Sequence, residues 1–188
     1  LGFIPKTISN FTKNVEMIFN KKRDLLIVVG GGSLPPQLYD RPHEDELQPN
    51  RDRMEEQVIH YCVAHGIPII ATCRGMQYIN VMFGGKLWYH PKLPVNRTRG
   101  VDHQVWLVKE QRNIWVNNYH SDCIYEEGLA SCFEPLAIDR ENHVVEAYGS
   151  DEMKILALQW HPERRFETAN AYEETRKIIL DFIQKYVK

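Results

Sequence analysis

A cysteine stands between small residues at the point where an apolar run ends. The stretch "ATCRGMQ" (residues 71–77) places Cys73 two residues after Ala71 and two residues before Gly75. Small residues at those positions are typical of a nucleophile on a sharp strand-to-helix turn, where the backbones crowd together. A helix beginning directly after Cys73 would direct its N–H groups and positive dipole end at the sulfur, so we expect a lowered thiol pKa. The alternative is a buried cysteine that only fills the core.

A histidine near the end of the chain is suited to act as the base for such a thiol. In "QWHPERR" (residues 159–165), the proline after His161 favours an extended conformation at the histidine. Side chains two residues apart in an extended segment project to the same side, so His161 and Glu163 can share one face. The histidine would take the thiol proton and the carboxylate would orient its ring. A structural histidine at a strand end is the alternative.

Three consecutive glycines follow another apolar run, in "VVGGGSLPP" (residues 28–36). Glycines let the backbone approach a ligand closely and present its N–H groups. We expect an oxyanion hole made by the N–H groups of Gly31 or Gly32 together with that of Arg74. A phosphate-binding loop is a competing interpretation, although no Gly-Lys-Ser/Thr sequence follows the glycines. A plain turn with no binding role is the third interpretation.

Short apolar runs predict the strands that would position these groups. Residues 25–29 and 67–72 are continuous runs rich in branched side chains, which is typical of strands buried on both faces of a parallel sheet. Residues 50–66 carry apolar side chains at helical spacing, with Asn50 able to cap the start and Gly66 able to end the helix. The glycines and the cysteine would therefore both follow buried strands.

The remaining predicted elements complete an α/β domain. They are helices over residues 11–18, 76–83 and 172–186 and strands over residues 103–108, 113–117, 143–148 and 155–160. Alternating helices and strands imply right-handed crossovers and a sheet covered on both faces. Residues 33–50 hold four of the ten prolines and predict a loop over the sheet edge. We expect a single domain over residues 1–188, with a mostly parallel central sheet and a small antiparallel strand region.

Composition argues against several classes of protein. The 188 residues have a net charge of −2, which gives no attraction toward nucleic acid, and no apolar run approaches the ~20 residues needed to cross a bilayer. We expect no nucleic acid or membrane partner, and the oligomeric state stays open. The four cysteines form no CxxC pair, which favours free thiols and a reducing cytoplasm. His120, Asp122 and Cys123 lack the paired spacing of a zinc site, so we expect no metal and no organic cofactor. The start at Leu1 rather than methionine suggests a missing N-terminal segment.

Taken together, these motifs resemble the class I glutamine amidotransferase-like proteins, in particular the γ-glutamyl hydrolases typified by γ-glutamyl-γ-aminobutyrate hydrolase. The resemblance runs from Asp24 to Glu163 through "DLLIVVGGG", "CRGMQ", "GGKL", "VNNYHSDCI" and "LALQWHPE". It implies a three-layer, flavodoxin-like fold and hydrolysis of a γ-glutamyl amide through a thioester, with release of glutamate. By this resemblance Cys73 is the nucleophile, His161 the base and Glu163 the orienting acid.

The resemblance also implies residues that bind the substrate. Gln77 and the turn formed by Asn118, Tyr119 and His120 would hold the α-amino and α-carboxylate ends of a γ-glutamyl group. The sequence departs from the family pattern in two places. Ala71 stands where the cysteine turn usually has glycine, and "HSDC" follows the tyrosine where a second histidine and a glutamine are common. The second departure concerns the leaving-group side of the pocket.

The segment of residues 86–103 is locally cationic and contains aromatic side chains. Cations interleaved with aromatic rings suit a phosphate-bearing leaving group that contains a base, so we expect Arg97 and Arg99 to bind substrate. The sequence is also similar to the γ-glutamyl-CDP-amidate hydrolases of capsule phosphoramidate synthesis, which implies cytidine diphosphoramidate as the second product. An amine such as γ-aminobutyrate is the alternative leaving group, and a solvated loop is the alternative role for the cations.

Two rival functions remain open at this point. A glutaminase subunit that delivers ammonia to a synthase partner would have the same nucleophile, but this chain carries no synthase sequence. A non-catalytic binding module would keep the fold without the chemistry, which the joint presence of Cys73, His161 and Glu163 disfavours.

Overall fold

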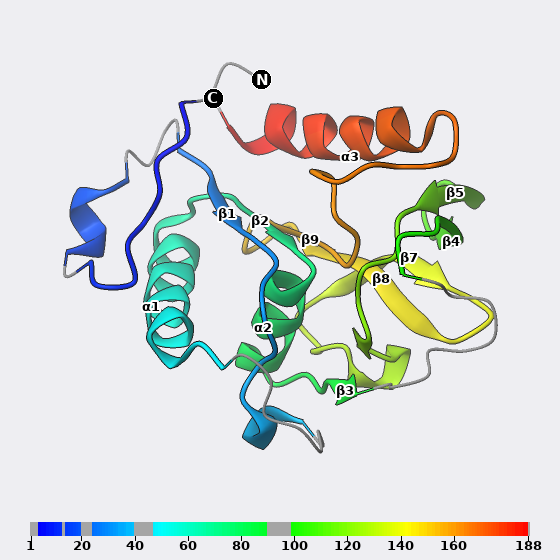
Figure 1. Cartoon of the computed structure of the whole chain (residues 1–188). Coiled ribbons are helices and arrows are strands. Elements are labelled where there is room, and N and C mark those ends of the chain that lie inside the picture. The colour runs from blue at the N-terminus through cyan, green and yellow to red at the C-terminus, as the bar shows by residue number, and fades with distance from the viewer. Residues whose placement is uncertain (1–3, 13, 20–23, 40–46, 90–98, 188) are drawn as a thin grey trace.

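Seven strands form the central sheet of the molecule. The computed structural model describes residues 4–12, 14–19, 24–39, 47–89 and 99–187 (Figure 1). The strand order is β1-β2-β9-β8-β7-β4-β5. The strands are β1 Leu26–Val28, β2 Ile69–Thr72, β4 His103–Leu107, β5 Arg112–Val116, β7 Glu134–Asp139, β8 Val144–Ser150 and β9 Ile155–Leu158. A separate antiparallel pair joins β3 (Trp88–Tyr89) to β6 (Asp122–Cys123).

The pairing directions divide the central sheet into two parts. Strands β1, β2 and β9 pair in parallel, and we refer to them as the parallel part. Strands β8, β7, β4 and β5 continue the sheet with antiparallel pairings and form the antiparallel part. The antiparallel part is larger than the small region that the sequence predicts.

Helices cover both faces of the sheet (Figure 1). The long helices are α1 Pro49–His65, α2 Arg74–Met82 and α3 Ala171–Tyr186. Because side chains alternate along a strand, Ile69 and Ala71 of β2 join the core under α1 and α2, while Ile70 joins the core under α3. This burial on both faces explains the continuous apolar run. The three-layer, flavodoxin-like arrangement confirms the predicted fold class.

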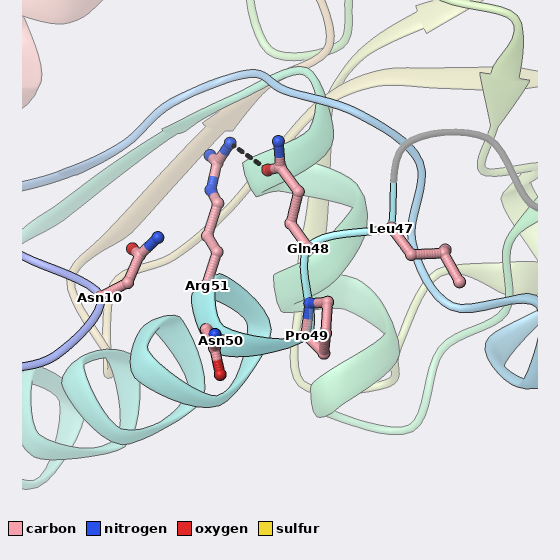
Figure 2. Close-up of a pocket in the computed structure, with 6 residues that line it drawn as sticks. All are labelled: Asn10, Leu47, Gln48, Pro49, Asn50 and Arg51. Carbon is pink, nitrogen blue, oxygen red and sulfur yellow. Dashed lines mark hydrogen bonds between the residues drawn. The ribbon is translucent and has the colours of Figure 1, made fainter.

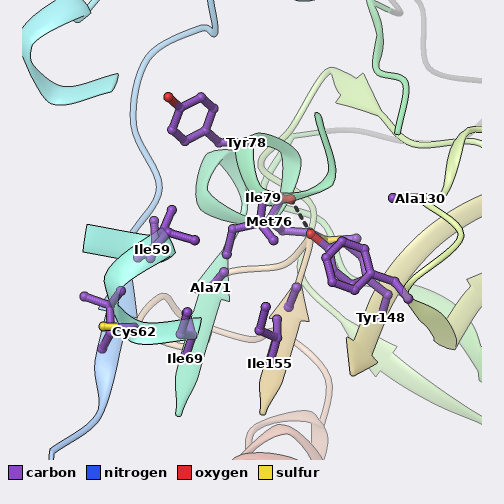
Figure 3. Packing of buried hydrophobic residues seen from close by; sticks show 14 of the residues in the cluster. Ile59, Cys62, Ile69, Ala71, Met76, Tyr78, Ile79, Ala130, Tyr148 and Ile155 are labelled. Atoms are coloured by element: carbon purple, nitrogen blue, oxygen red, sulfur yellow. Dashed lines mark hydrogen bonds between the residues drawn. The ribbon is translucent and has the colours of Figure 1, made fainter. Parts of the chain in front are cut away.

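Figure 3 shows the core between the sheet, α1 and α2. Ile59 of α1, Ile69 of β2 and Ile79 of α2 are fully buried there. Full burial of one such side chain stabilises the fold by about 1.5–3 kcal/mol. Tyr148 of β8 adds a directional contact, because its hydroxyl donates a hydrogen bond to the Met76 carbonyl at 2.6 Å. This contact ties the start of α2 to the antiparallel part of the sheet.

The ends of α1 follow the local sequence. Gly66 terminates the helix as predicted, with a φ of 65° that glycine adopts without a steric penalty. The next residue, Ile67, donates its N–H to the Cys62 carbonyl at 2.9 Å and so satisfies the last turn. The helix begins at Pro49, one residue before the predicted cap Asn50, where the missing N–H of proline costs no helical hydrogen bond.

One predicted helix is wrong. Among the described residues of the segment 11–18, the only helical structure is a short 3-10 turn, Val15–Met17. Phe11 and Met17 are exposed whereas Val15 is buried, so the segment has no continuous apolar face to pack. The predicted loop over residues 33–50 holds a second 3-10 turn, Pro36–Leu38, and the first residues of α1.

Strands β3, β6 and β7 are absent from the predicted elements. β3 and β6 have only two residues each, and β7 contains Pro135 and a register shift on either side of Ala137 that breaks its alternation. Among the helices that the structure describes, none combines the length and the apolar character needed to span a membrane.

Candidate active site

Three neighbouring parallel strands end at the same edge of the sheet, and each delivers one part of the site. β1 leads into the glycine loop, β2 into Cys73, and β9 into His161. A Cβ placed on Gly30 would lie 2.7 Å from His161 Cε1 and 3.6 Å from Cys73 Cβ. Gly30 therefore lies against both side chains, and a larger residue would not fit. Ligand sites in α/β sheets lie at this carboxyl edge.

The turn at Cys73 is strained in the way the sequence predicts. Cys73 has a φ of 50° and a ψ of −111°, outside the ordinary regions for a residue with a Cβ. Its N–H donates to the Leu158 carbonyl at 2.8 Å, which fixes the end of β2 against β9. A Cβ on Gly75 would overlap the Val28 carbonyl oxygen, so the residue two positions after the cysteine must be glycine. The fully buried Ala71 occupies the other crowded position.

The pKa of Cys73 moves in the direction opposite to the prediction. Burial raises the pKa of this thiol to about 11, because a thiolate would lose its hydration. The Arg74 N–H and the Arg164 guanidinium lower the pKa, but their combined effect is smaller than that of burial. The first N–H of the helix thus lowers the pKa as expected, but the predicted net lowering is wrong because burial outweighs it. The sulfur is protonated at neutral pH and needs a base before it can attack.

His161 is placed to serve as that base. Its Nδ1 lies 2.6 Å from Glu163 Oε1 and, facing a carboxylate, acts as the donor. In the neutral ring Nε2 is then the acceptor, and this nitrogen lies 3.5 Å from the Cβ position of Gly30. The histidine is buried, whereas the carboxylate side chain is 59% exposed. The predicted sharing of one face by His161 and Glu163 is present.

Asn117 holds the backbone of the histidine, a role that the sequence interpretation misses. Its Nδ2 donates to the His161 carbonyl at 2.8 Å, and its Oδ1 accepts from the His161 N–H at 2.9 Å. The side chain is fully buried directly after β5. The sequence does offer a signal, because Asn117 is a polar residue at the end of a predicted strand. The "VNNYH" motif, however, points to the next residue, Asn118, as the binding residue.

Two of the predicted substrate-binding residues, Gln77 and His120, share a hydrogen-bond acceptor inside the protein. Gln77 Nε2 donates to the Asp122 carbonyl at 3.1 Å and to Gln159 Oε1 at 3.2 Å. His120 Nδ1 donates to the same Asp122 carbonyl at 3.0 Å, and its Nε2 lies 3.7 Å from Glu146 Oε1. Gln77 and His120 are both buried, and each forms hydrogen bonds within the folded chain.

Of the other two predicted substrate-binding residues, Tyr119 adjoins the histidine. The Tyr119 ring meets the His161 ring edge-on, with 5.7 Å between centroids, and the Arg164 guanidinium lies 4.3 Å from the Tyr119 ring centre. Asn118 is buried, and its carbonyl accepts from the Gly100 N–H at 2.6 Å. The tyrosine turn therefore lies beside His161.

The predicted cationic residues differ in what the structure shows of them. Arg99 is exposed and directly precedes Gly100, so its backbone reaches the Asn118 turn. Arg97 lies outside the residues that the structure describes. Arg164, next to Glu163, is a cation with a direct contact to Tyr119.

The predicted oxyanion residues lie on two elements. Gly31 and Gly32 continue the loop after Gly30, and Arg74 is the first residue of α2. The Arg74 guanidinium is buried in ion pairs with Asp52 and Glu55 of α1, so the backbone N–H is the group that this arginine offers near the sulfur. The described residues contain no group of three or more metal-ligating side chains arranged to hold a metal ion.

The chain belongs to the Peptidase C26 family, whose model matches residues 7–163. It is 30% identical over 164 residues to the candidate glutamine amidotransferase-like protein YvdE of Lactococcus lactis, covering 77% of this chain and 68% of that protein. It is 26% identical to the γ-glutamyl-γ-aminobutyrate hydrolase PuuD of Escherichia coli K12, covering 79% of this chain and 67% of that protein. Family membership supports a hydrolase of the glutamine amidotransferase-like type.

The fold has a counterpart among solved structures. A candidate GMP synthase component from Thermoplasma acidophilum superposes with a TM-score of 0.66 at 20% sequence identity. The match covers 96% of this chain and 81% of that one. At this identity the likeness shows the fold, which is that of the glutamine amidotransferases.

Proposed function

We propose that this protein hydrolyses the amide bond of a γ-glutamyl substrate and releases glutamate. Cys73 is the nucleophile, His161 the general base and acid, and Glu163 the residue that orients the histidine. The observation that carries this proposal is the position of Gly30, whose Cβ site lies against His161 Cε1 and Cys73 Cβ at once. Two residues far apart in the sequence thereby meet across one glycine, as a thiol and its base must.

The chemistry follows from the protonation states. Because the pKa of Cys73 is about 11, the thiol proton moves to His161 Nε2 as the sulfur attacks the δ-carbonyl carbon. The tetrahedral intermediate collapses when the imidazolium protonates the departing nitrogen, which leaves a γ-glutamyl thioester on the sulfur. His161 then takes a proton from water, the hydroxide attacks the thioester, and the thiol is regenerated as glutamate leaves. These acylation and deacylation steps balance without a redox partner or a metal ion.

The tetrahedral intermediates carry a negative charge on oxygen. The N–H groups of Gly31, Gly32 and Arg74 are the donors we assign to it, because the glycine loop and the start of α2 flank the sulfur. Loss of one such donor costs on the order of 3–4 kcal/mol in the barrier.

Gln77, Asn118, Tyr119 and His120 are the residues that we assign to the γ-glutamyl group. Asn118 supports this assignment, because its Oδ1 is buried and has no hydrogen-bond partner among the described residues. A ligand ammonium or N–H group there would satisfy it.

For the leaving group we propose a nucleotide-linked amide, with γ-glutamyl-CDP-amidate as the substrate. Two arginines support this assignment: the Arg164 guanidinium lies over the Tyr119 ring, and Arg99 directly precedes Gly100, whose N–H donates to the Asn118 carbonyl. One guanidinium group can bind two phosphate oxygens at once, and it can also stack on an aromatic base. γ-Glutamyl-γ-aminobutyrate is the second candidate, favoured by the relative PuuD.

The test compares three substrates on one protein. Glutamate release is measured with γ-glutamyl-CDP-amidate, γ-glutamyl-γ-aminobutyrate and free glutamine. We expect the highest kcat/KM on the nucleotide substrate, and a preference for γ-glutamyl-γ-aminobutyrate would overturn that assignment. Cys73→Ala should abolish release from every substrate while the fold is retained, whereas the exposed Cys132→Ala should keep it. Turnover by Cys73→Ala would remove the nucleophile.

Arg99→Gln provides the matching test of the cationic side chain. It should raise KM for the nucleotide substrate and leave KM for the amine unchanged. Equal effects on both substrates would mean that Arg99 has only a structural role.

A further inference from the structure

Arg51 in the first turn of α1 contacts the backbone of the glycine loop. Its Nη2 donates to the Val29 carbonyl at 2.6 Å and to the Gly30 carbonyl at 3.1 Å. One guanidinium nitrogen therefore holds the carbonyl groups of two successive peptides in the loop.

The guanidinium of Arg51 is itself held in place. Figure 2 shows the side chain beside Gln48, whose Oε1 accepts from Nη1 at 3.1 Å. Glu55 accepts from Nε at 2.6 Å, and the second oxygen of Glu55 pairs with the buried Arg74 guanidinium at 2.5 Å. Charge-assisted hydrogen bonds of this kind are short and directional. The contacts give the arginine one orientation, on one edge of a hollow of about 500 Å³.

The geometry of the peptide group turns this clamp into a constraint on the active site. In a trans peptide the carbonyl and the N–H point in opposite directions, and the described residues contain no cis peptide bond. Since the Val29 and Gly30 carbonyls point at Arg51, the N–H groups of Gly30 and Gly31 point away from it.

The two sides of the loop are occupied by different groups. The Cβ position of Gly30 faces His161 and Cys73, whereas a Cβ on Gly31 would overlap Nη1 of Arg51. The guanidinium and the Cys73–His161 pair thus contact different atoms of the loop. A rotation of either peptide would break its hydrogen bond to the guanidinium.

We propose that Arg51 is a positioning residue, which orients the Gly30–Gly31 peptide so that the Gly31 N–H donates to the oxyanion. This inference rests on the proposed hydrolysis and assigns a part of that site that lies on α1. Arg51 contacts no reacting atom. Its effect passes through the loop, and it should therefore act on the transition state rather than on substrate binding.

The principal test is Arg51→Gln, with Arg53→Gln as the matched control. Arg53 lies on the same helix turn but is exposed. We expect Arg51→Gln to lower kcat by about 100-fold, the effect of a misdirected oxyanion donor, with KM within about twofold of wild type. Arg53→Gln should leave both constants unchanged. A wild-type kcat in Arg51→Gln would overturn the inference, and so would a loss confined to KM.

A second variant tests the clamp without removing the arginine. In Gly31→Ala the added methyl group takes the place of Nη1, so the guanidinium must move away from the loop. We expect Gly31→Ala to lower kcat, and Gly31→Ala combined with Arg51→Gln to lower it no further than the more damaging single change, because both act on one contact. Strict additivity of the two effects would contradict the clamp.

A γ-glutamyl aldehyde separates this inference from the proposed function. The thiol adds to the aldehyde carbon, and the resulting oxygen occupies the oxyanion position. Its inhibition constant should rise in Arg51→Gln by about the same factor as kcat falls. Tight inhibition of wild type with unchanged affinity in Arg51→Gln would refute the clamp alone. Absence of inhibition and of glutamate release in wild type would refute the proposed function.

Discussion

The parallel and antiparallel parts of the sheet contribute to the site in different ways. The parallel part brings the glycine loop, Cys73 and His161 together, because β1, β2 and β9 are neighbours and end at one edge. The antiparallel part supplies Asn117, directly after β5, whose side chain binds both the N–H and the carbonyl of His161. The histidine and the residue that holds its backbone thus come from opposite parts of one sheet.

The two parts also bury different kinds of polar group. In the parallel part the buried reactive group is Cys73, which burial keeps neutral. In the antiparallel part Glu146 of β8 is fully buried, with His103 Nε2 at 3.4 Å and His120 Nε2 at 3.7 Å. A buried carboxylate requires such partners, whereas a buried thiol does not. The nucleophile can therefore lie in an apolar setting until the histidine withdraws its proton.

The largest expected effect concerns the thiol. Since its pKa is about 11, the rate at which iodoacetamide alkylates Cys73 should rise about tenfold per pH unit, or about 1000-fold between neutral pH and about pH 10. The measurement is peptide mass spectrometry on a Cys132→Ser background, which removes the exposed cysteine. An alkylation rate that no longer rises with pH above neutral pH would indicate a thiolate paired with an imidazolium. It would contradict the contrast between the neutral buried group of the parallel part and the partnered carboxyl group of the antiparallel part.

A smaller loss is expected from the antiparallel part. Asn117→Ala leaves the His161 N–H and carbonyl without their partners, and each such buried group costs about 1–3 kcal/mol. The thermal midpoint should fall, and the displaced imidazole should lower kcat by about 100-fold. The control is Asn113→Ala, an exposed residue of β5 whose side chain bonds only to the Gln104 side chain among the described residues. Wild-type kcat in Asn117→Ala would mean that β5 does not hold the base.

The smallest effect is expected at the exposed end of the triad. Glu163→Gln keeps an oxygen that can accept from His161 Nδ1 but loses the charge that stabilises the imidazolium. Because the side chain is 59% exposed and its charge is screened by solvent, we expect kcat to fall by only about tenfold. Glu167→Gln, an exposed carboxylate four residues later, should change nothing. An unaltered kcat in Glu163→Gln would remove this residue from the mechanism.

The sequence predicts the parallel part better than the antiparallel part, for a physical reason. A strand buried on both faces, such as β2 with Ile69 and Ile70, appears as a continuous apolar run. Helices such as α1 carry their own end signal at Gly66. β7 has no such signature, because Pro135 and a bulge interrupt its alternation. The segment around Phe11 has helical spacing, but its apolar residues do not share one buried face, since Phe11 is exposed and Val15 is buried.

The same distinction applies to the site. Cys73, His161 and Glu163 stand in local motifs, so the chemistry we propose for them can be predicted from the order of residues. Asn117 and Arg51 contact backbone groups of distant segments, and the order of residues does not say which backbone groups a polar side chain will bind. The predicted pKa of Cys73 is wrong because the sequence shows the helix that follows the thiol but not the depth of its burial.

The central claim is that the Cys73 sulfur carries the γ-glutamyl group between the two halves of the reaction. The direct measurement is an acid quench during turnover of a γ-glutamyl amide, followed by digestion and mass spectrometry of the peptides. We predict one γ-glutamyl group on the peptide that contains Cys73, and its absence from the Cys73→Ala protein. Release of glutamate without any adduct on that peptide, or with the adduct on another residue, would contradict the account.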